Sequence, residues 1–483
     1  MNAKPQMIAR LIMALLLAVG GIGTAVAQVA NTAYGDHALN SNRIGTYNSA
    51  FGYYALHAND SGSGNTASGT EALFSNSSGY FNTASGGFAL YSNDNGSSNT
   101  ATGYAALFRN TFGYANSANG DHALYSNTTG GANTASGFEA LYRNTTGSSN
   151  TASGYNALYW NTVGIFNTAT GRSALVGNTT GNYNTANGGF ALKGNTTGNN
   201  NTADGSYALF SNTTGIKNSA AGSNALYTNT SGESNTASGY AALYRNATGS
   251  NNSASGYASL YSNTTGSNNV AVGYYAGYYP TAGSNNIEIG NRGIAADNAV
   301  IRIGTQGTQS ATYLAGVSGA NVTGGATVVV NAQGQLGVVS SSRRYKEDIQ
   351  SMGASSDRLL KLRPVTFRYK QPDEKGQKPE QFGLIAEEVA QVMPELVVYN
   401  GMGQPETVAY QTLAPLLLNE LQREHKRADE RVSELRQQLA AQGKELVSMK
   451  SQLAELRRLT AQLVADRGLD SDEAEPTTQV AIR

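Results

Sequence analysis

Asparagine recurs every 17 residues from Asn31 to Asn269, and this fixed period is the strongest constraint on the fold. It defines 15 copies of a unit: Asn, then Thr, Ser or Val, then Ala-x-Gly-x-x-Ala-Leu-x-x-Asn-x-x-Gly-x-x, with small departures in a few copies. A short unit at constant spacing is typical of a solenoid, because each unit covers only its neighbours. One Gly in every five or six residues, without a 3.6-residue apolar pattern, excludes a helix.

Each coil is expected to contain two short strands, such as 150–154 and 157–159, with turn residues around 161–164. Stacking places identical side chains about 4.8 Å apart, so that the asparagines can form amide ladders and the glycines can adopt backbone angles barred to other residues. Two alanines, a leucine and the aromatic residue that often follows it would form the interior. So thin a core is marginal for one chain and predicts that several chains associate into a fibre.

The unit resembles the head repeats of trimeric autotransporter adhesins over roughly residues 31–290, although those heads commonly use shorter coils. The resemblance implies a trimeric parallel β-roll and an adhesin-like role, with cell-surface or host glycans or proteins as partners. The aromatic column could stack on sugars, or it could pack between chains. The Thr columns could bind ice, and Asn-Thr-Thr triplets match the glycosylation pattern, but structural turns are favoured for the triplets.

Residues 1–27 have a positive start, a short apolar core and Ala25-Val26-Ala27 before Gln28, which is the pattern of a secretory signal peptide. We therefore expect a secreted or bacterial cell-surface protein with no membrane span in the mature chain. Zero net charge argues against a nucleic-acid partner. The absence of Cys excludes disulfides and thiolate sites, and four scattered histidines predict neither a metal site nor a cofactor: His37, His57, His122 and His425.

Charge density changes abruptly at Ser341. The 340 residues before it contain 11 Lys or Arg and 10 Asp or Glu, whereas the 143 residues from Ser341 onward contain 21 and 22. We therefore expect a mainly β chain in which a small α+β domain and a C-terminal coiled coil follow the solenoid. The expected segments are a signal peptide (1–27), the β-solenoid (28–290), a β neck (291–340), the α+β domain (341–415), the coiled coil (416–465) and a disordered tail (466–483).

Local patterns support this division. The neck contains a strand, a turn and a second strand over 326–337. A short helix is expected at 357–362, a strand at 364–369, a polar loop at 371–380, and a strand that turns into a helix over 382–394. From Leu418, apolar residues follow alternating steps of three and four to Leu463, with polar breaks, which predicts a coiled coil of about six heptads.

Four motifs follow one another from Ser341: Ser-Ser-Arg-Arg-Tyr-Lys (341–346), Arg-Pro-Val-Thr-Phe-Arg-Tyr-Lys (363–370), Gly-Leu-Ile-Ala-Glu-Glu-Val (383–389) and Pro-Glu-Leu-Val (394–397). In this order they resemble the intramolecular chaperone auto-processing domain found at the C-terminus of phage endosialidases and tail fibres and in myelin regulatory factor. The resemblance implies that the domain trimerises the chain, helps the preceding β-structure to fold, and cuts itself off before a serine. That serine would be Ser341 and its lysine Lys346. The family often has Asp after the serine, where this chain has Ser342.

The chemistry is consistent with that implication. A serine hydroxyl is a weak nucleophile until a base takes its proton, and a lysine can be that base where burial or cations such as Arg343 and Arg344 lower its pKa. Attack on the Ser340 carbonyl would break the bond between Ser340 and Ser341. The sequence therefore predicts single-turnover autoproteolysis by a Ser-Lys dyad.

Two alternatives remain open. One is a tail-fibre-like protein that binds or degrades glycans, although a glycosidase needs paired carboxylates and the solenoid has few Asp or Glu residues. The other is a fibre whose C-terminal domain is a permanent trimer clasp without cleavage. The hypothesis that we favour is a secreted, trimeric surface fibre with a self-cleaving intramolecular chaperone.

Overall fold

The computed structural model describes residues 30–317, 322–331, 333–373 and 375–467. The expected signal peptide and residues 468–483 of the expected tail lie outside these ranges. The chain divides into two compact units, one up to Ala315 and the other from Gly316 onward. Each is taken by itself below.

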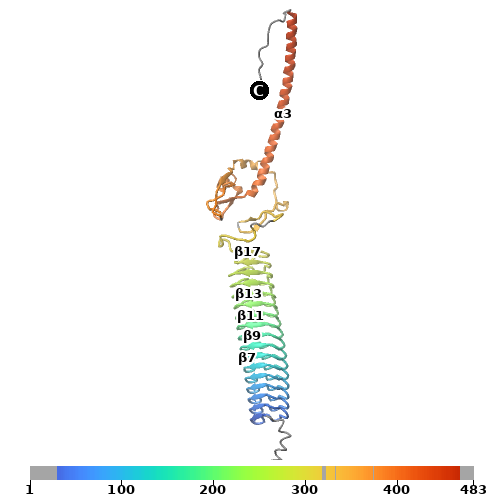
Figure 1. Ribbon diagram of the computed structural model, residues 1–483, viewed down its shortest axis with the longest axis vertical. Helices are drawn as coiled ribbons and strands as arrows, with labels where there is room; N and C mark the ends of the chain where they lie inside the picture. The colour runs from blue at the N-terminus through green and yellow to red at the C-terminus, as the bar shows by residue number, and fades with distance from the viewer. Residues whose placement is uncertain (1–29, 318–321, 332, 374, 468–483) are drawn as a thin grey trace, which may run out of the picture. The chain divides into compact units, whose positions relative to one another are not determined.

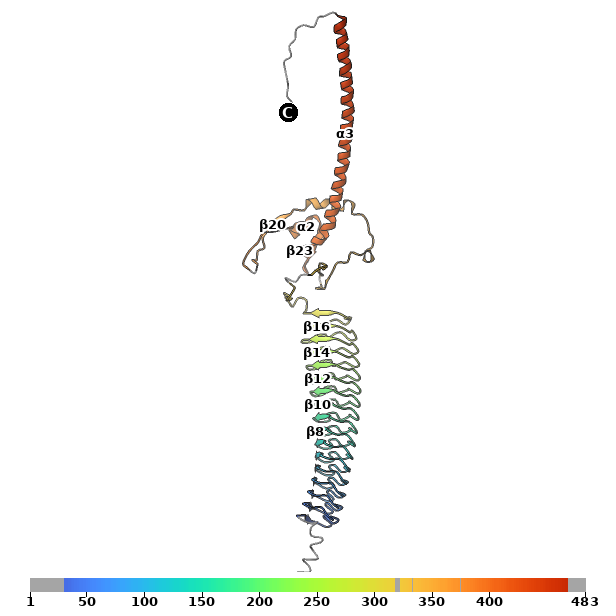
Figure 2. The ribbon, with the colours of Figure 1, turned by 45° about the vertical axis from the view of Figure 1, so that its right-hand side comes forward.

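The first unit is a parallel β-solenoid, as predicted (Figures 1 and 2). Its described part forms a 17-stranded sheet in which each strand pairs in register with the next along the chain. Most strands have the sequence Thr or Ser, Ala, and a small residue, and only the alanine is buried. The strands are β1 (Thr32–Tyr34), β2 (Ser49–Phe51), β3 (Thr66–Ser68), β4 (Thr83–Ser85), β5 (Thr100–Thr102), β6 (Ser117–Asn119), β7 (Thr134–Ser136), β8 (Thr151–Ser153), β9 (Thr168–Thr170), β10 (Thr185–Asn187), β11 (Thr202–Asp204), β12 (Ser219–Ala221), β13 (Thr236–Ser238), β14 (Ser253–Ser255), β15 (Val270–Val272), β16 (Ile287–Ile289) and β17 (Ile301–Ile303).

The expectation of two strands per coil was wrong, because each described coil contains only one. In the coil of β8, Asn156 and Leu158 have φ of +53° and +54°, in the left-handed region, so the segment 157–159 cannot be extended. It still pairs between coils, since the Leu158 N–H donates to the Ala174 carbonyl at 3.0 Å. The backbone hydrogen bonds that would form a second strand are therefore made by a chain of tight turns.

The core of the solenoid is thinner than expected. Ala152, Ala157 and Leu158 are fully buried in their coil, as their counterparts are in most others. The aromatic residue after the leucine does not join them: Tyr142 and Tyr159 are half-buried at the coil surface, with ring centroids 5.1 Å apart and nearly parallel planes. The left-handed leucine takes up the interior space and directs the next side chain outward.

Two asparagine ladders stabilise the coils, as the sequence predicted. The Asn150 N–H donates to Asn133 Oδ1 at 3.0 Å, and Asn161 Nδ2 donates to Asn144 Oδ1 at 2.8 Å. Both amides of one coil also donate to the same carbonyl, that of Gly164. Each ladder asparagine bonds to an asparagine of the neighbouring coil, so its substitution disturbs two coils. The partner that is left buried without a hydrogen bond costs about 1–3 kcal/mol.

The last coils replace the inner alanine by charged residues. Ala271, Glu288 and Arg302 are in register on β15, β16 and β17, at the central position of each strand. Glu288 is fully buried, and Asp297, which is 3% exposed, forms a bidentate ion pair with Arg302 at 2.6 and 2.7 Å. The sheet therefore ends over a small cluster of ionisable groups.

The second unit begins with the predicted strand, turn and strand, seen as the antiparallel pair β18 (Val329–Val330) and β19 (Leu336–Gly337). Further elements match the expected order of short helix, strand, loop, strand and helix (Figure 2). They are the 3-10 helices η2 (Arg343–Tyr345), η3 (Gly353–Lys361) and η4 (Pro394–Leu396), the antiparallel pair β20 (Val365–Phe367) and β21 (Gln381–Gly383), helix α2 (Ala386–Val392), the antiparallel pair β22 (Val397–Tyr399) and β23 (Pro405–Val408), and helix α3 (Tyr410–Asp466).

A small hydrophobic core joins these elements. Leu359, Val389, Met393, Leu396 and Leu416 are buried in one cluster, drawn from η3, α2, η4 and the start of α3. Beyond this region α3 continues as a single helix, 57 residues in all. Its predicted heptad side chains are exposed in the single chain, for example Leu439 at 70% and Leu446 at 51%. No helix among the described residues is both long and apolar enough to cross a membrane.

Candidate active site

The structure brings together the two side chains that the sequence singled out. Lys346 Nζ donates a hydrogen bond to Ser341 Oγ at 3.1 Å. The residues between them form η2, in which the Tyr345 N–H donates to the Ser342 carbonyl at 3.0 Å and the Lys346 N–H donates to the Arg343 carbonyl at 3.2 Å. One tight turn therefore accounts for the spacing of five residues.

Ser342 holds the start of that turn. Its Oγ accepts hydrogen bonds from the Arg344 N–H at 3.4 Å and from Arg344 Nε at 3.3 Å, as the N-cap of η2. A side-chain oxygen at this position satisfies a backbone N–H that the helix cannot use. Ser342 thus acts on the turn, whereas Ser341 contacts the lysine.

The pair is open to solvent in the single chain. Ser341 and Lys346 are both exposed, and so are Arg343 and Arg344. The Arg344 guanidinium lies 5.6 Å from the centre of the Tyr345 ring, and that ring is itself 70% exposed. Among the described residues, the Lys346 side chain makes no hydrogen bond or ion pair other than that with Ser341.

Two of the sequence motifs meet through an ion pair. Arg363, which begins the second motif, donates from Nε to Glu388 Oε2 at 3.0 Å, and Glu388 belongs to the third motif. This hydrogen bond holds the pKa of Glu388 below its usual range. The Leu384 N–H, in the same motif, donates to the Tyr410 hydroxyl at 3.0 Å, which links the motif to the first residue of α3.

A buried polar network that sequence reasoning missed fastens η3 to α3. Ser356, fully buried, donates to Glu420 Oε2 at 2.8 Å, and Asn419 Nδ2 donates to Ser356 Oγ at 2.6 Å. Arg423 Nη1 donates to the same carboxylate at 3.0 Å and also pairs with Asp357. No local sequence pattern indicates this network, because Ser356 and Glu420 lie 64 residues apart in the chain.

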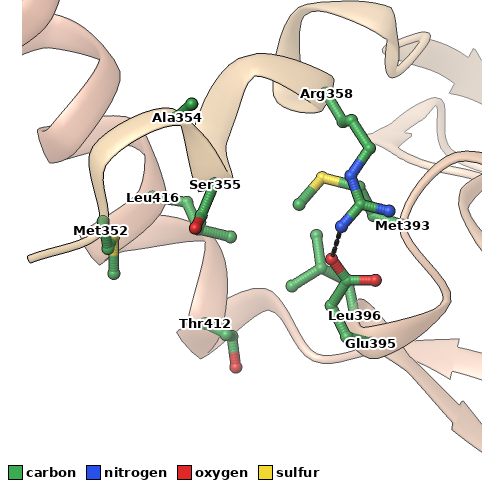
Figure 3. Close-up of a pocket in the computed structure, with 9 residues that line it drawn as sticks. All are labelled: Met352, Ala354, Ser355, Arg358, Met393, Glu395, Leu396, Thr412 and Leu416. Atoms are coloured by element: carbon green, nitrogen blue, oxygen red, sulfur yellow. Dashed lines mark hydrogen bonds and ion pairs between the residues drawn. The ribbon is translucent and has the colours of Figure 1, made fainter. Parts of the chain in front are cut away.

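The same region contains an open cleft of about 350 Å³ that does not include the Ser-Lys pair (Figure 3). Its walls include Met352, Met393 and Leu416. Arg358 crosses it and donates to the Val392 carbonyl at 3.1 Å while pairing with Glu395. Glu395 is the single carboxylate of the lining and is already paired, so the cleft lacks two free carboxylates. Across the described residues, no three His, Asp or Glu side chains lie together as a metal site.

Comparison with protein families finds a match to part of the chain. Residues 341–398 match the family described as the chaperone of endosialidase. The chain contains a chaperone of endosialidase domain. The match begins at Ser341 and ends in β22, and it includes all four motifs on which the resemblance was based. A comparison with curated proteins found no match for this chain.

The chaperone of endosialidase domain follows the β-solenoid along the chain and ends before α3 begins. Such domains imply trimerisation of the chain that contains them. The Ser341–Lys346 hydrogen bond lies at the very start of the matched range.

Proposed function

We propose that this protein is a secreted, trimeric surface fibre whose chaperone of endosialidase domain assembles the solenoid and then releases it by cutting between Ser340 and Ser341. The observation that carries the proposal is the 3.1 Å hydrogen bond between Lys346 Nζ and Ser341 Oγ at the first residue of the family match. The order of the chain, with the solenoid first and the chaperone after it, supports the release of the solenoid as the product.

The chemistry needs only groups of this chain and water. Neutral Lys346 takes the Ser341 hydroxyl proton, and Oγ attacks the Ser340 carbonyl carbon. The C–N bond of that peptide breaks as the nitrogen receives the proton from Lys346, which leaves Ser340 as an ester on Ser341 Oγ. Water then hydrolyses the ester, which gives a Ser340 carboxylate and restores the Ser341 hydroxyl beside the amino group that the previous step freed. Each chain reacts once, because the bond that it cuts is its own.

Assembly would exclude the water that surrounds the Ser341–Lys346 pair in the single chain. A lysine is a base only without its extra proton, and water around an exposed ammonium keeps that proton bound. We propose that three chains joined through the exposed heptad side chains of α3 enclose the start of the domain and exclude water from Ser341 and Lys346. Cleavage would then follow trimer formation and could not precede it. The exposure of the pair also favours the second candidate, a permanent clasp that never cuts.

An adhesive role for the solenoid remains part of the proposal, and the aromatic columns limit how it could bind sugars. The rings of Phe108, Tyr125 and Tyr142 stack with centroids 5.1 Å apart and planes within 8° of parallel. Each ring face inside a column is therefore covered by its neighbour, and only edges face the solvent. In this column a sugar ring could stack only at an end, such as Tyr159, where the next residue in line is Val176.

Intact mass measurement of the full-length protein tests the proposal. Cleavage gives a smaller fragment of 143 residues that begins with Ser341. An uncut chain of full mass, in a sample shown to be trimeric, would favour the clasp.

A further inference from the structure

The outward face of the solenoid sheet changes character at its last three strands. On β2 to β14, the first and third residues of each strand face outward and are mostly Thr or Ser. On β15, β16 and β17, both positions are Val or Ile. We call these six residues the aliphatic face: Val270, Val272, Ile287, Ile289, Ile301 and Ile303.

The aliphatic face forms two straight columns without a charged group. Val270, Ile287 and Ile301 are in register, and so are Val272, Ile289 and Ile303. The ionisable Glu288 and Arg302 occupy the alternate position, and alternate residues of a strand point to opposite sides of the sheet. Ile301 and Ile303 are 65% and 69% exposed, and Val272 is 45% exposed. The side chains are therefore available to a partner without a charge to desolvate.

We propose that copies of this chain meet through the sheet face of the solenoid, with the aliphatic face as the anchor that keeps them together after the chaperone domain is cut away. This inference rests on the proposed function. A second copy is the matching occupant, because parallel coil axes bring Val and Ile of one copy to the height of Val and Ile of the other, strand by strand. On the aliphatic face of both copies the facing positions are uncharged, so no ion is left unpaired there.

The small area of the aliphatic face and its place in the chain explain why the chaperone domain must bring the copies together before they can associate through this face. Six aliphatic side chains offer a few hundred Å² per copy, below the roughly 800 Å² that each partner contributes to a standard interface. Ser341 follows Ile303 by 38 residues, so a trimerising domain would hold the aliphatic faces of neighbouring copies at high local concentration. Once they meet, the Thr and Ser columns of β2 to β14 on the same sheet face add polar contact area.

The natural chain contains no Cys, so a single introduced cysteine can form a disulfide only with its counterpart in another copy. Val272→Cys and Ile303→Cys place one thiol on the aliphatic face, and Thr265→Cys places one on an exposed bend of a neighbouring coil, outside the strands. After mild oxidation of the full-length protein, we expect covalent dimers on a denaturing gel for the first two variants and at least tenfold fewer for Thr265→Cys. Equal cross-linking of all three, or of none, would overturn the proposal. If the chain's own neck covered the aliphatic face, no dimers would form, and the proposal would be wrong.

A charge test separates this inference from the proposed cleavage. In the double variant Val272→Asp, Ile289→Asp, the cut before Ser341 should still occur, but the released solenoid should sediment as a monomer. Thr265→Asp is the matched control and should remain trimeric. Resistance of the double variant to limited proteolysis shows that its coils are folded. A released, folded double variant that remains trimeric would overturn the inference, whereas an uncut wild-type chain would contradict only the proposed function.

Discussion

Lys346 reaches back over one 3-10 turn to donate a hydrogen bond to Ser341 Oγ, and both side chains are exposed in the single chain. The turn itself depends on Ser342, whose Oγ accepts from the Arg344 backbone. The hydroxyl that would attack, the amine that would accept its proton and the residue that shapes the turn are therefore three separate side chains. Each can be removed without the other two.

Replacement of either member of the pair should abolish the cut. Ser341→Ala removes the nucleophile and Lys346→Ala removes the base, but neither changes the heptad side chains or the core of the domain. We expect full-length mass for both variants, with the trimer intact by sedimentation, and two fragments for the wild type. A Ser341→Ala chain that is cut at the same bond would rule out the dyad.

Ser342 should affect the rate and leave the position of the cut unchanged. Loss of an N-cap costs about 1 kcal/mol, so Ser342→Ala should slow cleavage by roughly fivefold through a less populated turn. Ser342→Asp should restore the rate, because an aspartate caps a turn as well as a serine does. Single-turnover time courses measure both. If Ser342→Ala blocked cleavage completely, the role assigned to Ser341 would pass to Ser342.

Charges in the heptad seam should prevent both assembly and cleavage. Leu439→Glu with Leu446→Glu places like charges where the helices of three chains would meet. We expect monomers that remain uncut, whereas Lys444→Glu, outside the seam on the same helix, should assemble and cut normally. In assembled wild type the cleavage rate should not change with protein concentration. Cleavage of the monomeric double variant at the wild-type rate would contradict the dependence on assembly.

The solenoid should need its chaperone to fold. Most coils bury only two alanines and a leucine as apolar side chains, so we expect the segment 28–340 expressed alone to aggregate or remain unfolded. The same segment released from the full-length chain should stay folded and trimeric. Circular dichroism and sedimentation of the two preparations provide the comparison. A soluble, monomeric, β-rich segment from direct expression would remove the need for a chaperone.

The repeat predicted the coil because positions such as Asn150 and Gly154 have a single structural use. Gly154 has a φ of +138°, and a Cβ there would lie 2.6 Å from the Gly171 carbonyl oxygen, so only glycine fits. The second strand was mispredicted because leucine gives no sign of a left-handed φ, which long-range pairing imposes on Leu158. The four motifs predicted the chaperone domain, but the Ser356–Glu420 contact joins residues 64 apart and has no local pattern.

Glu288 also lacked a sequence pattern, and it makes the end of the solenoid sensitive to pH. It is fully buried, and its carboxyl group lies beside that of Asp297. Burial, together with the neighbouring Asp297 carboxylate, raises the pKa of Glu288 from 4.5 to about 8. The hydrogen bond from Arg302 lowers the pKa of Asp297. At neutral pH the cluster therefore contains a protonated Glu288 beside an ionised Asp297.

The two carboxyl groups have opposite linkage to folding. The folded state binds the Glu288 proton more tightly than the unfolded chain, so its contribution is complete below pH 4.5 and is lost as the pH rises to about 8, by up to about 1.4 kcal/mol per pH unit. The Asp297 contribution is present above the ordinary pKa of 3.8 and is lost in acid. Stability of the last coils should therefore be greatest in mildly acidic solution.

Replacement of Glu288 should remove the alkaline loss of stability. Glu288→Gln keeps the shape without the titration, and Glu288→Ala restores the residue found in register at Ala271. Both variants should keep their melting temperature between pH 6 and 9, whereas the wild-type solenoid should lose several degrees. Asp297→Asn is the matched control and should be less stable than wild type at neutral pH, because Arg302 loses its ionic partner. Thermal unfolding of the released solenoid across this pH range decides the matter: a wild-type curve as flat as that of Glu288→Gln would mean that Glu288 is not held protonated in the folded protein.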